Sequence, residues 1–160
     1  MTISELEEHK ILPFDTDDTK IIKLFSFFLH AAPTIDSKSA ANIDEHRLNR
    51  NWTEYIQQWD SKQYRFLSHS ASIDRSIKLC GLEPESEIKR RTKGFVCKRK
   101  TKDESDCQCF LRHIRNSIAH GSVYMKNGGN RKYILFKDSK GAVILLSQSD
   151  LSLLKRVIMK

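Results

Sequence analysis

The chain has 160 residues, and its 28 Lys plus Arg outnumber its 20 Asp plus Glu, which gives a net charge of +8. The length suits a single domain, and the low share of Gly and Pro excludes a collagenous or low-complexity chain. A membrane-spanning helix is excluded too, because it needs about 20 apolar residues and the longest strictly apolar run extends only from Ala142 to Leu146.

The N-terminus and the cysteines indicate the compartment. Residues 1–10 are polar and acidic and lack the apolar core of a secretory signal. In a chain without an export signal, cysteines are expected to be reduced thiols rather than a disulfide framework; these are Cys80, Cys97, Cys107 and Cys109. We therefore expect a cytoplasmic protein that does not bind membranes.

The first half of the chain shows helical periodicity. Apolar residues at helical spacing predict a first helix over 17–32, with N-caps among Asp15 to Asp18 and a stop at Pro33. Asn42 and Glu45 resemble a capping box for a second, aromatic-rich helix that continues to Trp59. A third helix is predicted over 61–80, with Gly81 as its C-terminal stop.

The second half mixes helix and strand signals. Residues 82–104 contain Pro84, Gly94 and the basic cluster, which predicts an irregular or partly helical connector. A fourth helix begins near 103–105 and ends at Gly121. Two short apolar runs, 133–136 and 142–146, flank a Gly-containing loop and predict a β-hairpin. A short last helix follows, capped by Ser149 or Asp150.

These elements predict a mainly α fold, a helical bundle with a C-terminal β-hairpin and a short final helix. We expect one domain over 1–160, in which the helical core covers about 17–121, the basic connector 82–104, and the hairpin with its helix 131–159. Helical bundles carry functional side chains on facing helices, so unexpected polar groups on a helix mark a candidate site.

The end of the fourth helix gathers such groups beside its apolar stripe. Asn116 and His120 are four residues apart and share one face, and Arg112 lies one turn before Asn116. The side chain of Arg115 is long enough to curl toward the same end. The pattern predicts a polar site at an interface.

The run Arg115-Asn116-Ser117-Ile118-Ala119-His120 resembles the Arg-x4-His motif of the HEPN superfamily, in the form with Asn after the Arg. HEPN domains are small helical bundles that carry this motif on a late helix. The resemblance implies a metal-independent endoribonuclease without a cofactor, whose site is assembled from two protomers of a homodimer. Many relatives are toxins or abortive-infection effectors, which implies RNA as substrate and an antitoxin or regulatory partner.

The chemistry of these side chains fits that role. Cleavage of RNA by its own 2′-hydroxyl needs a proton acceptor and donor near pH 7, which His120 supplies. It also needs a cation beside the charged phosphorane, which Arg115 supplies, while Asn116 orients the His or the phosphate. The competing interpretation is that His120 is a helix C-terminal His favoured by the macrodipole and Arg115 an ordinary surface residue.

Eight basic residues and no acidic residue lie between Lys89 and Lys102, and we call this segment the basic run. It has three interpretations: a contact for nucleic acid, a solvated loop, or a docking site for an acidic partner. We favour delivery of RNA to the motif helix, with Arg112 as a further contact. The predicted RNA-binding residues of the run are Lys89, Arg90, Arg91, Lys93, Lys98, Arg99, Lys100 and Lys102.

Two alternatives remain open. A non-catalytic HEPN-like module would bind nucleic acid or a nucleotide, or regulate a partner, without cleavage. Separately, a Cys₃His zinc site is conceivable, but its spacing lacks the usual C-x₂₋₄-C pair, and a buried Cys often serves as a small hydrophobe. Its ligands would be Cys97, Cys107, Cys109 and His113.

Overall fold

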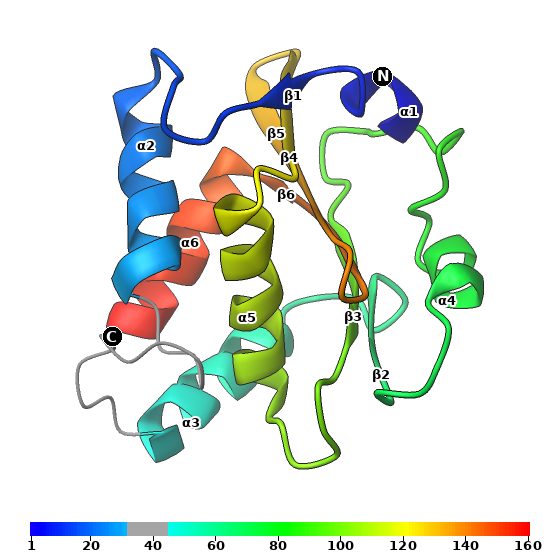
Figure 1. Ribbon diagram of the computed structural model, residues 1–160, viewed down its shortest axis with the longest axis vertical. Helices are drawn as coiled ribbons and strands as arrows, with labels where there is room; N and C mark the ends of the chain where they lie inside the picture. Colours follow the sequence, from blue (N-terminus) through cyan, green and yellow to red (C-terminus); the bar gives the residue numbers. More distant parts are fainter. Residues whose placement is uncertain (32–44) are drawn as a thin grey trace.

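The computed structural model describes residues 1–31 and 45–160, and within them the chain forms an α/β fold around one six-stranded sheet (Figure 1). The strand order is β1-β4-β5-β6-β3-β2. Only β2 and β3 run parallel, and the remaining neighbours are antiparallel. The strands are β1 (Lys10–Ile11), β2 (Tyr64–Leu67), β3 (Gly94–Lys98), β4 (Val123–Gly128), β5 (Arg131–Asp138) and β6 (Ala142–Ser147).

The helices cover the sheet unequally. Four of them form a thick layer on one face, and two short ones lie against the other face (Figure 1). The thick layer holds α2 (Thr19–Ser26), which continues as a π-helical turn η1 (Phe27–Ala31), together with α3 (Glu45–Ile56), α5 (Asp106–Ala119) and α6 (Gln148–Met159). The thin layer holds α1 (Ile3–Leu6) and α4 (Asp74–Leu79).

Because both faces are covered, the central strands are apolar throughout rather than alternating. All six residues of β6 are buried. Its side chains alternate between two cores: Ile144 and Leu146 pack with the thick helical layer, whereas Val143 and Leu145 pack toward α1 and α4. Because both faces of these strands are buried, the residues of the hairpin form uninterrupted apolar runs in the sequence.

The expectation of a mainly α bundle is therefore wrong. The predicted third helix over 61–80 is replaced by β2, a turn and the short α4. The predicted connector over 82–104 contains β3, whose Phe95, Val96 and Cys97 are fully buried. A further strand, β4, was not predicted. These strands are short, and a strand of four to six residues leaves little periodic signal in the sequence.

The predicted hairpin is confirmed as β5 and β6, but it lies in the middle of the sheet instead of being appended to a bundle. The predicted helices over 17–32, from 45 to 59 and over 105–121 are confirmed in outline by α2 with η1, α3 and α5. Helix α6 begins slightly early, with Ser147 as N-cap in a capping box with Asp150. The expected signals at Ala32, Pro33 and Asn42 lie outside the described residues.

The aromatic residues form one cluster around β3. The Phe95 ring contacts five other rings, with centroid separations between 4.6 and 6.4 Å. Its partners come from α3 and the turn after it, β2 and α5: Trp52, Trp59, Tyr64, Phe66 and Phe110. In the part of the chain that the structure describes, no helix is long and apolar enough to cross a bilayer.

Candidate active site on helix α5

Helix α5 has well-defined ends. The Ser105 hydroxyl accepts a hydrogen bond from the Gln108 N–H at the start, as a good N-cap does. At the other end His120 is the C-cap, and Gly121 follows with φ of 68°, the left-handed conformation that favours glycine. The helix therefore ends at the last residue of the Arg-x4-His motif, which places His120 at a helix terminus.

Arg112, the first polar residue of the predicted site, lies in the interior. Its Nε and Nη2 atoms donate to the two carboxylate oxygens of Glu104 at 2.7 and 3.0 Å. Nη2 also donates to the Lys98 carbonyl at 3.2 Å. The Arg112 side chain is only 6% exposed and that of Glu104 1%. The structure thus places this guanidinium in a buried two-point ion pair rather than on the surface.

His113 is buried beside it and faces two acceptors. Its Nδ1 lies 2.7 Å from Asp138 Oδ2, and its Nε2 lies 2.7 Å from the Lys98 carbonyl oxygen. Arg112 Nη2 also lies 3.4 Å from His113 Nε2, so both ring nitrogens have polar neighbours. The buried network therefore joins Arg112 and His113 to the carboxyl groups of Glu104 and Asp138, which meets the need of buried polar groups for partners.

The two carboxyl groups of the network titrate below their usual range. Burial by itself would raise the pKa of Glu104, but hydrogen bonds from Arg112 and the Lys100 N–H outweigh it, so the pKa is lowered. Burial likewise opposes ionisation of Asp138, and hydrogen bonds from His113, the Lys140 N–H and Asn116 lower its pKa. Both groups are therefore carboxylates at neutral pH.

Asn116 joins this network to the predicted motif. Its Nδ2 donates to Asp138 Oδ2 at 3.1 Å, the same oxygen that His113 contacts. The amide of Asn116 is thus held in one orientation by a residue at the end of β5. The sequence did not identify Asp138 and Glu104 as members of the site. Their only signal in the sequence was their position: Asp138 is the last residue of the apolar strand β5, and Glu104 comes just before α5.

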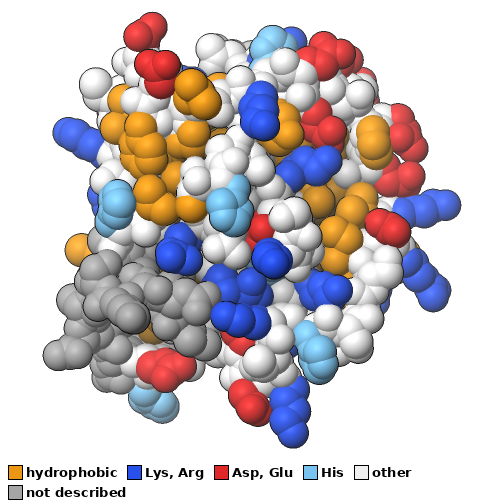
Figure 2. Space-filling view, in the orientation of Figure 1, with side chains coloured by type: hydrophobic (Ala, Val, Ile, Leu, Met, Phe, Trp, Pro, Cys, Tyr) orange, Lys and Arg blue, Asp and Glu red, His pale blue; other side chains and the backbone are white. Residues whose placement is uncertain are grey.

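Arg115 and His120 have a different environment. Arg115 is half-buried and His120 is exposed. Among the described residues neither side chain has a hydrogen-bonding or ionic partner. Figure 2 shows that Lys and Arg side chains gather over α5 and beside it on this face of the molecule. The structure therefore leaves the Arg and His of the motif free to act on a ligand, while Arg112 and His113 support the helix from inside.

The predicted basic run does not form one patch. Lys89, Arg90, Arg91 and Lys93 come before β3, and the remaining members follow at or after its end. Along the strand, Lys93 and Lys98 are about 16 Å apart, at about 3.3 Å per residue. Several members are also engaged: the Arg99 guanidinium lies 2.5 Å from Asp106 Oδ1, and Lys93 Nζ lies 4.5 Å from the Trp59 ring centroid.

The cysteines of the conceivable zinc site are buried thiols. Burial raises the pKa of Cys97 and Cys107 well above the usual value and that of Cys109 to about 12. The Cys109 thiol donates to the Lys98 carbonyl at 3.5 Å. Over residues 1–31 and 45–160, no three His, Cys, Asp or Glu side chains are grouped as a metal site requires. Protonated, buried thiols act here as small hydrophobes.

Comparison with known proteins agrees with the motif. The family described as HEPN pEK499 p136 matches residues 17–156, a span that includes α5, its buried network and the Arg-x4-His motif. Neither the curated proteins nor the solved structures gave a significant match. Because the family match covers most of the sequence, the chain belongs to the HEPN superfamily, as a domain of the pEK499 p136 family.

Proposed function

We propose that the chain is a metal-independent endoribonuclease whose reacting groups are Arg115 and His120. The observation that carries this proposal is the division of polar residues along α5. Arg112 and His113 are saturated with buried partners, whereas Arg115 and His120 face solvent without partners in the described residues. Arg115 and His120 are therefore the motif side chains that remain available to a substrate.

In the proposed reaction the RNA supplies its own nucleophile. His120 accepts the proton of a 2′-hydroxyl, whose oxygen attacks the adjacent phosphorus, and Arg115 stabilises the negative charge on the equatorial oxygens. The bond to the 5′-oxygen breaks, and a second His returns a proton to that leaving oxygen. The products are a 2′,3′-cyclic phosphate and a 5′-hydroxyl. Asn116, oriented by Asp138, positions the phosphate.

One subunit offers one such His, so we propose that the site is completed by a second copy of the chain. A two-fold dimer that brings the exposed ends of two α5 helices together supplies two Arg and two His. This arrangement also accounts for the lack of partners for Arg115 and His120 among the described residues of one subunit.

The test compares RNA cleavage by the wild type, Arg115→Ala and His120→Ala in the presence of a chelator. Matched controls are Arg75→Ala on α4 and His69→Ala after β2, which remove the same exposed side-chain types away from α5. We expect the two motif variants to lose at least about a hundredfold in rate, the lower range for a lost acid–base group. Equal cleavage by all five proteins would contradict the proposal.

The second candidate function is a HEPN-like module that binds nucleic acid or a nucleotide without cutting it. The observation that favours it is that no hydrogen bond orients the His120 ring among residues 1–31 and 45–160, whereas catalytic His residues are commonly oriented by a neighbour. This function predicts no cleavage products and binding that survives His120→Ala.

The biological role that we propose is that of a toxin or anti-phage effector, held in check by an antitoxin or another regulatory partner. Expression of the wild type is then expected to arrest growth, and His120→Ala is expected to relieve the arrest at the same protein level.

A further inference from the structure

Three neighbouring hollows run along the side of the molecule formed by the β4–β5 turn, α6 and α2. The first has a volume of about 660 Å³ and is lined by the β4–β5 turn and Arg90. The second, about 370 Å³, shares Asn130, Arg131 and Ser149 with the first. The third, about 450 Å³, shares Lys20, Ser152 and Arg156 with the second. The shared walls show that the three hollows adjoin one another, and together they form one depression along this side.

All the charged side chains that line this depression are positive. Its lining includes seven cations from four separate segments, and none of its lining residues is acidic. We call this surface the basic track; its cations are Lys20, Lys23, Arg90, Arg131, Lys132, Lys155 and Arg156. Lys132 is paired with Asp18, and the others make no ion pair among the described residues.

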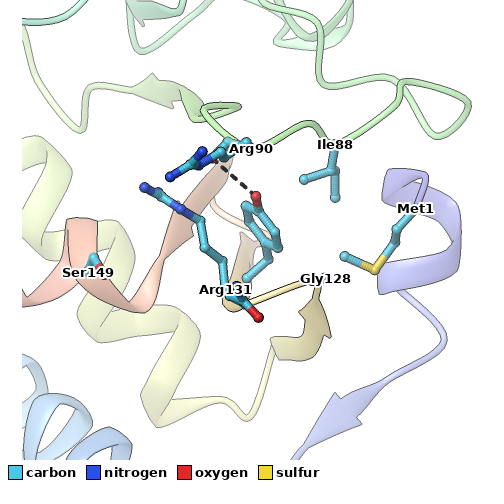
Figure 3. A pocket seen from close by; sticks show the side chains of 9 residues that line it. Met1, Ile88, Arg90, Gly128, Arg131 and Ser149 are labelled. Carbon is cyan, nitrogen blue, oxygen red and sulfur yellow. Dashed lines mark hydrogen bonds between the residues drawn. The ribbon is translucent and has the colours of Figure 1, made fainter.

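The first hollow shows how the fold aims these cations. The Arg90 and Arg131 side chains both line this hollow, and their guanidinium groups extend toward the side where Ser149 lies (Figure 3). The Tyr133 hydroxyl donates to the backbone carbonyls of Lys89 and Arg90 at 3.0 and 3.3 Å, which fixes the Arg90 backbone against β5. Two like charges held together without a carboxylate raise the electrostatic potential of the hollow and favour an anion there.

Between the cations the middle of the track carries small polar groups. Ser147, Gln148, Ser149 and Asn130 line the second hollow, which has no apolar side chain in its lining. Apolar side chains line parts of the two outer hollows: Met1, Ile88 and Tyr133 in the first, and Leu24 and Met159 in the third. Lys and Arg interleaved with hydroxyl and amide donors are the residues that contact phosphates and sugars in protein–nucleic acid complexes. An acidic helix from a partner protein would need a continuous apolar groove for its anchors, and the polar second hollow interrupts the apolar surface between the first and the third.

We propose that the basic track binds the phosphodiester backbone of single-stranded RNA. Apart from Arg90, none of its cations belongs to the basic run of residues 89–102. The β4–β5 turn, at one end of the track, is separated from the end of α5 by strand β4, which spans about 17 Å. The proposal concerns binding, so it holds whether or not the chain cleaves RNA.

The experiment measures binding of a fluorescein-labelled, 2′-O-methylated RNA 20-mer by fluorescence anisotropy at several salt concentrations. This probe has no 2′-hydroxyl and is not cleaved by the proposed reaction. The track variant is Arg131→Ser with Arg156→Ser. The control variant, Arg75→Ser with Lys78→Ser, removes the same charge from exposed positions on α4, across the sheet from α2 and α6. Circular dichroism and the Tm check that both variants fold.

We expect the track variant to weaken binding about twentyfold at 0.1 M salt and to reduce the slope of log K against log salt by about 1.4, because each lost contact to a single strand contributes about 0.7. The control variant is expected to retain the wild-type slope. Equal losses in both variants, or no loss in either, would overturn the proposal. So would a 20-residue polyglutamate that competes as well as unlabelled RNA, because that result assigns the track to an acidic protein.

Discussion

Arg112 and Arg115 lie three residues apart on α5 and have the same side chain, but their burial and their partners differ. The Arg112 guanidinium is buried and bonded to Glu104, while Arg115 is half-buried at the solvent side. Removal of one partner from a buried ion pair leaves the other charge uncompensated. The same substitution therefore affects stability at one position and is expected to affect function at the other.

We expect Arg112→Ala to lower the free energy of unfolding by about 3 to 5 kcal/mol, because it leaves the Glu104 carboxylate buried without its partner. Arg115→Ala is expected to change it by less than about 0.5 kcal/mol, as surface substitutions do. Urea unfolding of both variants measures the difference. A stable Arg112→Ala protein would show that the buried pair contributes nothing.

Asp138 connects stability to pH. Its pKa is lower in the folded chain than its ordinary value, so the carboxylate stabilises the fold above the unfolded pKa of about 3.9. That contribution is lost as the pH falls through the folded pKa. We expect Asp138→Asn to be less stable than the wild type at pH 7 and the gap to shrink in acid. Urea unfolding between pH 2.5 and pH 7 tests this expectation.

The exposed Asp17→Asn is the matched control for Asp138→Asn, because it removes the same charge from the segment before α2. It is expected to show no pH-dependent gap. A constant gap for Asp138→Asn over the whole pH range would mean that its carboxylate charge is not the stabilising feature.

At the scale of elements, β3 connects the sheet, the aromatic cluster and the helix of the candidate site. It lies between β2 and β6, and its Phe95 is the centre of the aromatic cluster. The Lys98 carbonyl at its end accepts hydrogen bonds from both Arg112 and His113. A segment that the sequence predicts as a basic connector thus supports both the core and the helix of the candidate site.

We expect Phe95→Ala to cost about 3 to 5 kcal/mol of unfolding free energy, as deletion of a buried Phe side chain does. The control is Phe14→Ala, which removes a Phe that is 46% exposed and is expected to cost less than about 1 kcal/mol. Guanidinium unfolding compares the two. Similar losses would indicate that residues 94–98 do not form a central strand.

At the scale of the whole molecule, tertiary structure redistributes the charge. The sequence places the whole net charge between residues 89 and 102, but the fold divides that run at β3 and gathers Lys and Arg from other segments into the basic track. Electrostatic attraction acts between groups that are near in space, within about 10 Å at moderate salt. The track is therefore an electrostatic feature of the fold and has no counterpart in the linear sequence.

The proposed composite site makes activity depend on assembly. On dilution below the dimer Kd, the cleavage rate per subunit is expected to fall, because a monomer has only one His and one Arg at the site. Cleavage assays across a concentration series, with sedimentation at the same concentrations, test this. A constant rate per subunit where the protein is monomeric would show that one chain is sufficient.

The sequence by itself determined the features that depend on neighbours along the chain. The apolar periodicity predicted α2, α3 and α5, the loop at Gly141 predicted the β5–β6 hairpin, and the Arg-x4-His run indicated the HEPN family, which the family match confirms. Each of these signals lies within about 20 residues, and local hydrogen bonds and side-chain spacing are sufficient to encode it.

Only the tertiary structure decided the fold class and the surroundings of the motif. Strand β2 pairs with β3, about 30 residues away, and β3 pairs with β6, almost 50 residues away. Asp138 accepts a hydrogen bond from Asn116, which lies 22 residues away in the sequence. A strand is stabilised by backbone hydrogen bonds to another strand, so a short apolar segment becomes a strand only when a distant partner is in place.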